Sequence, residues 1–147
     1  MLAREIRTEV RIAAPPQRVW AVLTDFGTYG QWNPFFVAVT GVAEPGAALS
    51  LRTKLFERST PRNFAVTVRV ADPARKLEWG GGLGIPRLMD GVHGFELTAD
   101  GGGTAVRHYE RLTGLLVPPA GRLVSTLEKR YLTLNDALRR RAEQIAP

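Results

Sequence analysis

The two histidines of the chain both fall in a stretch that predicts a β-hairpin. Residues 88–99 and 104–112 have strand-like patterns, and the acidic, glycine-rich run 100–103 between them is a strong turn signal. If the residues that flank this run face each other, His93 lies directly opposite Glu110. The sequence therefore predicts a histidine and a carboxylate side by side on neighbouring strands.

The face that carries this pair is otherwise apolar. Alternate residues of a strand share a face, so one side of the hairpin collects His93, Phe95, Leu97, Val106, His108 and Glu110. On the other side Glu96 lies opposite Arg107, an ion pair suited to solvent. We therefore expect the apolar face, with both histidines, to point into the protein.

An inward pair of His93 and Glu110 has three interpretations. It can act as a general acid and base, it can orient the polar group of a ligand, or its members can simply satisfy each other's hydrogen bonds. Together with His108 the pair also contains the two histidines and one carboxylate of a facial metal triad. However, His93 and His108 lie diagonally across the hairpin, and nothing else in the sequence supports metal binding. We expect no metal and no cofactor.

Composition excludes several other kinds of site. A chain of 147 residues suits one domain, residues 1–147, with a single core. Without cysteine there is no disulfide, cysteine nucleophile or zinc ribbon. None of the three serines lies in a Gly-x-Ser-x-Gly motif, which argues against a serine hydrolase. The glycine-rich run 80–84 lacks the Lys-Ser/Thr ending of a phosphate loop, so we expect a mobile loop at a cavity mouth there.

The formal net charge of +6 invites a nucleic-acid partner. The longest run of like charge is only Arg139-Arg140-Arg141, however, and no aromatic residue is interleaved with a basic cluster. We expect no specific nucleic-acid partner. No segment is apolar enough for a transmembrane helix, and the N-terminal residues lack the apolar stretch of a signal peptide. The sequence therefore predicts a cytoplasmic protein, monomeric or homodimeric.

The remaining segments supply the elements that must hold the hairpin. A strand is expected over 6–12, and a helix that starts near the prolines at 15 and 16 runs to about Thr24. A turn and a short second helix, stopped by Pro34, follow it. Alternating apolar residues and turn signals then predict strands at 36–42, 48–56, 64–71 and 75–80. After the hairpin, apolar residues recur every three or four positions from Pro118 onward, which predicts one long amphipathic helix.

This order of elements predicts an α+β fold, a curved antiparallel sheet of about seven strands wrapped around the C-terminal helix. The first strand is expected to close one edge of the sheet. A curved sheet over one helix leaves space between them, where a ligand cavity could lie. The polar face of the helix carries six basic residues, Arg122, Lys129, Arg130, Arg139, Arg140 and Arg141.

Several segments resemble one known superfamily. In residues 12–23 a strand ends at two prolines and a Val-Trp helix follows, and a second short element runs from Asp25 into Trp32-Asn33-Pro34-Phe35. Residues 113–116, Thr-Gly-Leu-Leu, leave the last strand after Glu110. Together these segments resemble the START-like helix-grip superfamily (SRPBCC), and within it the polyketide cyclase/dehydrase and lipid transport group. The resemblance spans nearly the whole chain and implies a helix-grip fold around a mostly apolar cavity.

The resemblance does not determine an activity, because members bind lipids, hormones or polyketides, act as cyclases, or serve as chaperone partners. We expect a carrier or sensor of a small hydrophobic ligand, such as a lipid, a polyketide or an aromatic metabolite. Its candidate ligand-binding residues are Trp32, Phe35, Phe56, Trp79, His93, Phe95, His108, Glu110 and Tyr131. One alternative is a polyketide cyclase/dehydrase-type enzyme with His93, Glu110 or His108 as catalytic candidates. Another is an interaction module that uses the basic C-terminal helix.

Overall fold

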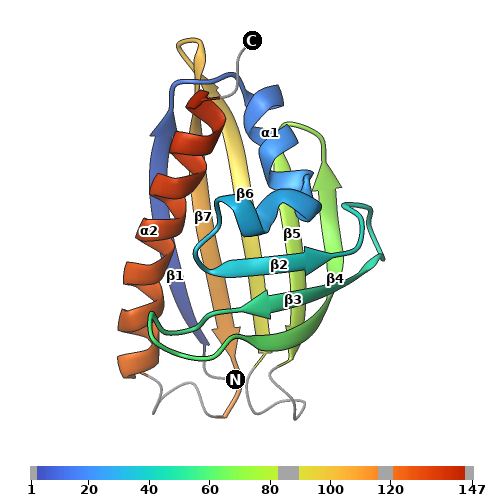
Figure 1. The fold of residues 1–147 in the computed structure, drawn as a ribbon, viewed down its shortest axis with the longest axis vertical. Helices are drawn as coiled ribbons and strands as arrows, with labels where there is room; N and C mark the ends of the chain where they lie inside the picture. The colour runs from blue at the N-terminus through green and yellow to red at the C-terminus, as the bar shows by residue number, and fades with distance from the viewer. Residues whose placement is uncertain (1–2, 83–89, 116–120, 145–147) are drawn as a thin grey trace.

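The computed structural model describes residues 3–82, 90–115 and 121–144 (Figure 1). The chain folds into one antiparallel sheet of seven strands, against which a long C-terminal helix packs. In chain order the elements are β1 (Ala3–Ile12), α1 (Pro16–Thr24), the 3₁₀ helix η1 (Phe26–Gln31), β2 (Phe36–Thr40), β3 (Ala48–Thr53), β4 (Arg62–Asp72), β5 (Lys76–Gly82), β6 (Asp90–Asp100), β7 (Gly103–Thr113) and α2 (Gly121–Gln144).

The strands lie in the order β1-β7-β6-β5-β4-β3-β2, and each pairs antiparallel with its neighbour. As expected, the first strand closes one edge, where it pairs with the last strand. In Figure 1, β2 and β3 cross in front of β5 and β6 at a steep angle, because the sheet curls into a half-barrel. The predicted α+β helix-grip architecture is confirmed.

The β6–β7 hairpin has the register that the sequence predicts, with His93 paired to Glu110. The turn is shorter than expected, since only Gly101 and Gly102 lie between the last paired residues. Their φ angles of +55° and +87° are left-handed, which a two-residue hairpin turn requires and which glycine adopts without strain. This turn fixes the register that brings the histidine and the carboxylate together.

The glycine run after Trp79 lies partly in a strand, which corrects the expectation of a loop. Gly81 and Gly82 belong to β5, whereas residues 83–89 lie outside the described part of the chain. A Cβ atom at Gly81 would lie 2.8 Å from the carbonyl oxygen of Ala65 and 2.9 Å from Cγ1 of Val66. Glycine is needed here because β4 approaches β5 closely.

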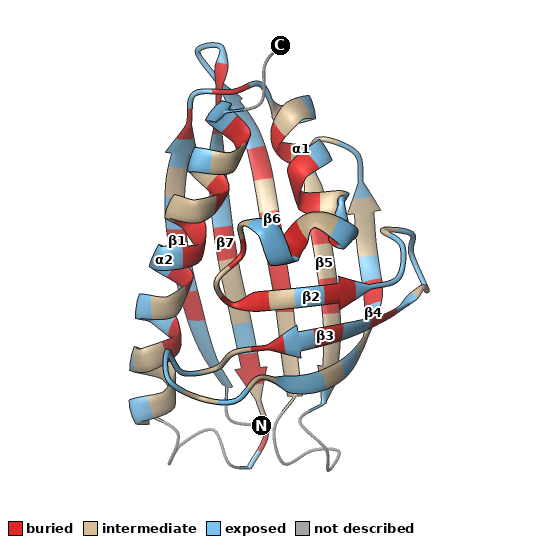
Figure 2. Ribbon diagram, in the orientation of Figure 1, coloured by how far each residue is buried: buried red, intermediate tan, exposed pale blue. Residues whose placement is uncertain are grey.

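The core lies between the concave face of the sheet and the helices (Figure 2). Helix α1 begins with a proline in its first turn, which suits the fixed φ of that residue, and buries Val19, Val22 and Leu23. The apolar stripe of α2 is buried at the predicted spacing, at Leu127, Tyr131, Leu134 and Leu138. The stretch 116–120, where the helix was expected to begin, is not among the described residues.

Arg130 does not lie on the solvent face of α2, where the helical pattern places it. Its Nη2 donates to the carbonyl oxygens of Pro34, at 2.9 Å, and Lys54, at 3.0 Å. Its guanidinium carbon lies 5.8 Å from the ring centroid of Phe35. The side chain turns inward because its length and several donors let it reach two carbonyls at once. It thereby ties α2 to the segments that flank β2 and β3.

Much of the remaining positive charge on α2 is already paired. Arg139 lies 2.7 Å from the carboxylate of Asp136 and 3.1 Å from that of Glu143, and Arg140 lies 3.0 Å from Asp136. Arg141 donates to the side-chain oxygen of Gln31. Within residues 3–82, 90–115 and 121–144, no helix has both the length and the apolar character needed to cross a membrane.

Candidate ligand-binding site

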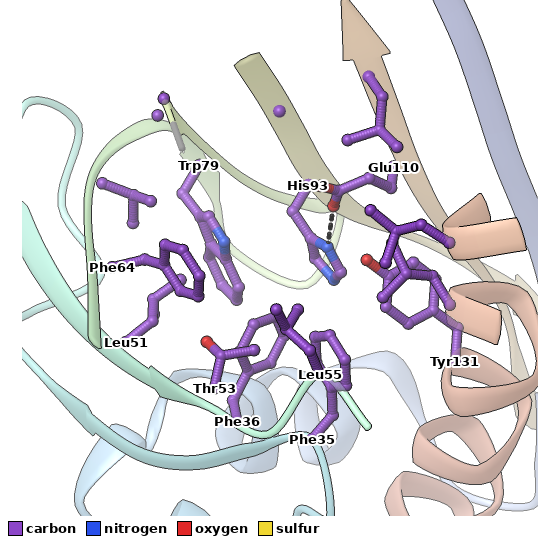
Figure 3. A pocket seen from close by; sticks show the side chains of 17 residues that line it. Phe35, Phe36, Leu51, Thr53, Leu55, Phe64, Trp79, His93, Glu110 and Tyr131 are labelled. Atoms are coloured by element: carbon purple, nitrogen blue, oxygen red, sulfur yellow. Dashed lines mark hydrogen bonds and ion pairs between the residues drawn. The ribbon is translucent and has the colours of Figure 1, made fainter. Parts of the chain in front are cut away.

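A cavity of about 100 Å³ lies between the sheet and α2 (Figure 3). Most of the side chains that line it are aromatic or aliphatic: Phe35, Phe36, Leu51, Leu55, Phe64, Val66, Trp79, Leu112, Leu123, Leu127 and Tyr131. Besides the phenol of Tyr131 and the indole N–H of Trp79, the described lining contains three polar side chains, Thr53, His93 and Glu110. The site is therefore an apolar chamber with few, localised polar groups, which is typical of a small-molecule pocket.

His93 and Glu110 meet at one side of the cavity. Nδ1 of His93 is hydrogen-bonded to Oε2 of Glu110, as the dashed line in Figure 3 marks. The side chains are 4% and 14% exposed, respectively, so the pair is nearly shielded from water. Gly91 makes room for the carboxylate, since a Cβ atom there would lie 2.7 Å from Oε1 of Glu110. The pair thus presents a carboxylate to the cavity.

A chain of hydrogen bonds continues from this pair into the protein. Nε2 of His93 lies 2.7 Å from Nε2 of His108, and Nδ1 of His108 lies 2.7 Å from Oδ1 of Asn135. The amide nitrogen of Asn135 donates to the hydroxyl of Thr8 at 2.8 Å, and Thr8 donates to the carbonyl oxygen of His108 at 3.1 Å. The network therefore links β6, β7, α2 and β1 behind the cavity wall.

The far end of the network assigns the positions of its protons. Thr8 donates its one proton to a carbonyl, so it must accept from the NH₂ group of Asn135, whose Oδ1 then faces His108. His108 accordingly carries its proton on Nδ1, and its Nε2 accepts from Nε2 of His93. Nδ1 of His93 is left to face Glu110. The histidine and the carboxylate therefore share a single proton at the cavity wall.

The pKa values agree with this assignment. Complete burial lowers the pKa of His108 well below its usual value, and the charge of His93 lowers it further. His108 is therefore neutral at neutral pH, as an acceptor at Nε2 must be. Burial raises the pKa of Tyr131 well above its usual value, and the charge of Glu110 and a hydrogen bond to it act in the same direction. The phenol therefore stays protonated beside the carboxylate.

Aromatic rings hold both imidazoles in position. Trp79 stacks on His93 with ring centroids 5.3 Å apart and planes 8° from parallel. Phe95 stacks on His108 with centroids 4.4 Å apart and planes at 16°. Neither imidazole can turn without losing this stacking together with its hydrogen bonds, so the network is rigidly oriented.

The structure brings part of the predicted residue set to the cavity wall, namely Phe35, Trp79, His93, Glu110 and Tyr131. Phe95 and His108 lie one layer behind the wall, where they support His93. Trp32 packs edge-on against Tyr29 instead and borders a separate groove between η1 and α2. Phe56 lies beyond the end of β3 at Thr53, is 46% exposed and does not line the cavity.

Several residues of the site had signals in the sequence that the prediction did not use. Thr53 shares the inward face of β3 with Leu49 and Leu51, so alternation alone places it in the interior. Asn135 follows Tyr131 by one helical turn, which puts a polar side chain on the apolar stripe of α2. Thr8 occupies the inward face of β1. A polar residue on a strand or helix face that is otherwise apolar is the signal that would have located these three residues.

A curled antiparallel sheet that closes on a C-terminal helix around an internal cavity defines the helix-grip class of ligand-binding folds. The chain belongs to the family described as polyketide cyclase / dehydrase and lipid transport, whose model matches residues 3–143. No curated protein matches the sequence.

Three solved structures illustrate the similarity. A START superfamily protein from Mycobacterium smegmatis has a TM-score of 0.78 and 19% identity, over 97% of this chain and 99% of that one. The Zhui aromatase/cyclase from Streptomyces sp. R1128 has a TM-score of 0.78 and 18% identity, over 97% and 95%. A norcoclaurine synthase point mutant from Thalictrum flavum, in complex with a transition-state analogue, has a TM-score of 0.72 and 13% identity, over 96% and 94%. At these identities the similarity shows a shared fold.

Proposed function

We propose that the protein binds a small, ring-containing hydrophobic molecule in the cavity between the sheet and α2, as its carrier or sensor. The observation that carries this proposal is the cavity itself, whose wall is apolar except at a few defined polar side chains. An apolar chamber of this kind gains free energy when a ligand buries apolar surface in it, while the polar groups decide the orientation. Membership of a family named for polyketides and lipids supports the same class of ligand.

The volume of the cavity limits the size of the ligand. Pockets for drug-sized molecules are roughly 300–1,000 Å³, whereas an apolar protein cavity of roughly 150 Å³ already takes up benzene. A cavity of about 100 Å³ is therefore on the scale of one ring. Leu55, Phe64 and Leu123 line the cavity and are only half-buried, so a substituent on that ring can extend past them towards solvent.

The polar groups favour a ligand that carries a hydroxyl. Glu110 uses Oε2 for His93 and also accepts from the phenol of Tyr131. A carboxylate has about four acceptor sites, so further acceptor capacity remains at the cavity wall. A ligand hydroxyl that donates to this carboxylate makes a charge-assisted hydrogen bond in an environment that excludes water. Phenol is therefore the simplest probe of the proposal.

Calorimetric titration with phenol at pH 7 tests the proposal. The wild-type protein should bind the probe, and Leu55→Trp, which fills the cavity from its rim, should weaken binding at least tenfold. Val42→Trp is the matched control, because Val42 is 54% exposed and does not line the cavity. Absence of binding to the wild type, or equal binding by Leu55→Trp, would contradict the proposal.

Acid–base catalysis on the bound ligand is a second candidate function. The observation that favours it is the proton shared by His93 and Glu110 at the cavity wall, held in place by a rigid network. Such a pair can remove a proton next to a carbonyl group and return it elsewhere, which is a step that cyclisation and dehydration require. The fold similarity to an aromatase/cyclase is consistent with this reading.

Hydrogen–deuterium exchange separates the two functions. With cyclohexanone, a single-ring ketone, as a probe in D₂O, an enzyme should accelerate exchange of the protons next to the carbonyl. Glu110→Gln and His93→Ala should abolish that acceleration while the probe still binds, whereas Glu96→Gln, on the outer face of β6, should not change it. If the variants lose affinity and the wild type accelerates nothing, the site serves binding alone.

A further inference from the structure

Thr53, the last residue of β3, carries a buried hydroxyl that the fold itself leaves unused. The residue is 3% exposed and lines the cavity. Its Oγ1 has no hydrogen-bond partner within residues 3–82, 90–115 and 121–144. Because a buried hydroxyl without a partner costs free energy relative to an apolar group of the same shape, a valine would suit the fold better here.

Other buried threonines of the sheet behave differently. The hydroxyl of Thr8 donates to the carbonyl oxygen of His108, and that of Thr104 donates to the carbonyl oxygen of Ala14 at 2.7 Å. Each therefore satisfies its donor within the protein and strengthens the fold. Thr53 is unlike them in that its hydroxyl belongs to the wall of a cavity. Its partner is best sought inside that cavity.

Thr53 lies far from the polar pair along the sheet. Three strands, β4, β5 and β6, separate β3 from β7, which carries Glu110. In Figure 3 the two side chains stand on different sides of the cavity, Thr53 beside Phe36 and Glu110 beside His93. One small polar group cannot serve both side chains, so a ligand that satisfies both must carry two separated polar groups.

The described side chains around Thr53 offer its hydroxyl no partner. The lining residues closest to it are Phe36, its partner on β2, Leu51 and Leu55, two residues away on either side in the chain, and Phe64 on β4. None of these side chains has a hydrogen-bond acceptor. The hydroxyl proton is therefore free to be donated. An oxygen atom of the ligand, from a hydroxyl or a carbonyl group, is the complementary acceptor.

We propose that Thr53 is a second polar anchor of the site, and that the ligand is a flat, single-ring molecule with oxygen substituents at two separated positions. One substituent is a hydroxyl that donates to Glu110, and the other is an oxygen that accepts from Thr53. This inference rests on the proposed binding function, and it narrows the class of ligand from apolar ring compounds to dioxygenated ones.

The test compares two probes of nearly the same shape and acidity, p-cresol and hydroquinone, which differ in one methyl or hydroxyl group. Their dissociation constants are measured by calorimetry under nitrogen at pH 7, for the wild type and for Thr53→Val. One hydrogen bond corresponds to a change of about fivefold in affinity. The substitution should therefore shift the ratio of the two constants by about fivefold against hydroquinone.

Thr40→Val on the exposed face of β2 is the control and should leave the ratio unchanged. The melting temperature of Thr53→Val should equal or exceed that of the wild type, since the hydroxyl it removes has no partner in the fold. An unchanged ratio, or a marked loss of stability, would overturn the anchor while the binding function stands. If neither probe binds the wild type, the binding function itself fails.

Discussion

His93 and His108 face each other through their Nε2 atoms, 2.7 Å apart, so one must donate and the other must accept. The choice is made at the far end of the network, where Asn135 accepts from Nδ1 of His108 and is itself oriented by Thr8. Asn135 and Thr8, which lie outside the cavity, therefore determine that Nδ1 of His93 faces Glu110. Positioning of this kind is specific and can be disturbed without touching the cavity wall.

Asn135→Leu should destabilise the protein. The substitution leaves the Nδ1 proton of His108 without an acceptor and Thr8 without a donor, and each buried unpaired group costs about 1–3 kcal/mol. We expect a total loss of about 2–3 kcal/mol in the free energy of unfolding, measured with urea. Thr133→Ala, at an exposed position of α2, should change it by less than about 0.5 kcal/mol. Equal effects of the two substitutions would contradict the network.

The stability of the protein should fall as the pH drops below about 6.5. The pKa of His108 is lowered by burial in the folded state, so only the unfolded chain binds a proton there in this range. Stability then rises with pH, by up to about 1.4 kcal/mol per pH unit for one proton, and levels off above the unfolded pKa. Urea unfolding between pH 7.5 and pH 5 measures this slope.

His108→Asn provides the comparison for that measurement, because its amide does not titrate. His93, Glu110 and Tyr131 face the same region and remain in both proteins, so their contributions appear in both slopes. The variant should show a smaller slope than the wild type over the same range. Identical slopes would mean that His108 binds its proton equally well in the folded and unfolded states.

Gly91→Ala should displace Glu110 without removing any polar group. The new Cβ atom would lie 2.7 Å from Oε1 of the carboxylate, closer than the two atoms can approach. We expect the hydrogen bond between Glu110 and His93 to break or reorient, with a change in the ¹⁵N shifts of the His93 ring and weaker binding of phenol. Gly27→Ala, where nothing lies within 4 Å of the new Cβ atom, should change neither.

Arg130→Met should loosen α2 from the rest of the protein. It removes two hydrogen bonds from a charged donor, to the carbonyl oxygens of Pro34 and Lys54, but keeps most of the apolar stem. Because hydrogen bonds from charged groups contribute about 1.5–3 kcal/mol, a loss of at least about 2 kcal/mol in unfolding free energy is expected. Arg122→Met, at an exposed position of the same helix, should have little effect.

Local sequence signals were sufficient for the order of the elements and for the hairpin. Strand alternation and a glycine turn determine the register of β6 and β7, so the meeting of His93 with Glu110 could be predicted from residue numbers. The prediction of site residues was less accurate when it depended on the exact end of a strand. Phe56 was expected at the cavity, yet β3 ends at Thr53 and Phe56 is 46% exposed.

Hydrophobic periodicity cannot predict contacts between segments that are far apart in the sequence. Nothing local indicates that Arg130 reaches carbonyls of two other segments, since a helical pattern only reports the face from which a side chain starts. The pairing of His108 with Asn135 joins residues on a strand and a helix that meet only in the folded protein. The shape of the cavity depends on the same long-range packing.

Isotope-filtered NOE spectroscopy on the complex with phenol tests the central claim most directly. If the ligand binds in the cavity, its ring protons should show NOEs to the aromatic protons of Phe35, Trp79 and Tyr131, which line the wall. The ring signals of His93 should shift on binding. NOEs only to residues outside the cavity, or saturable binding with no NOE to these three side chains, would contradict the account.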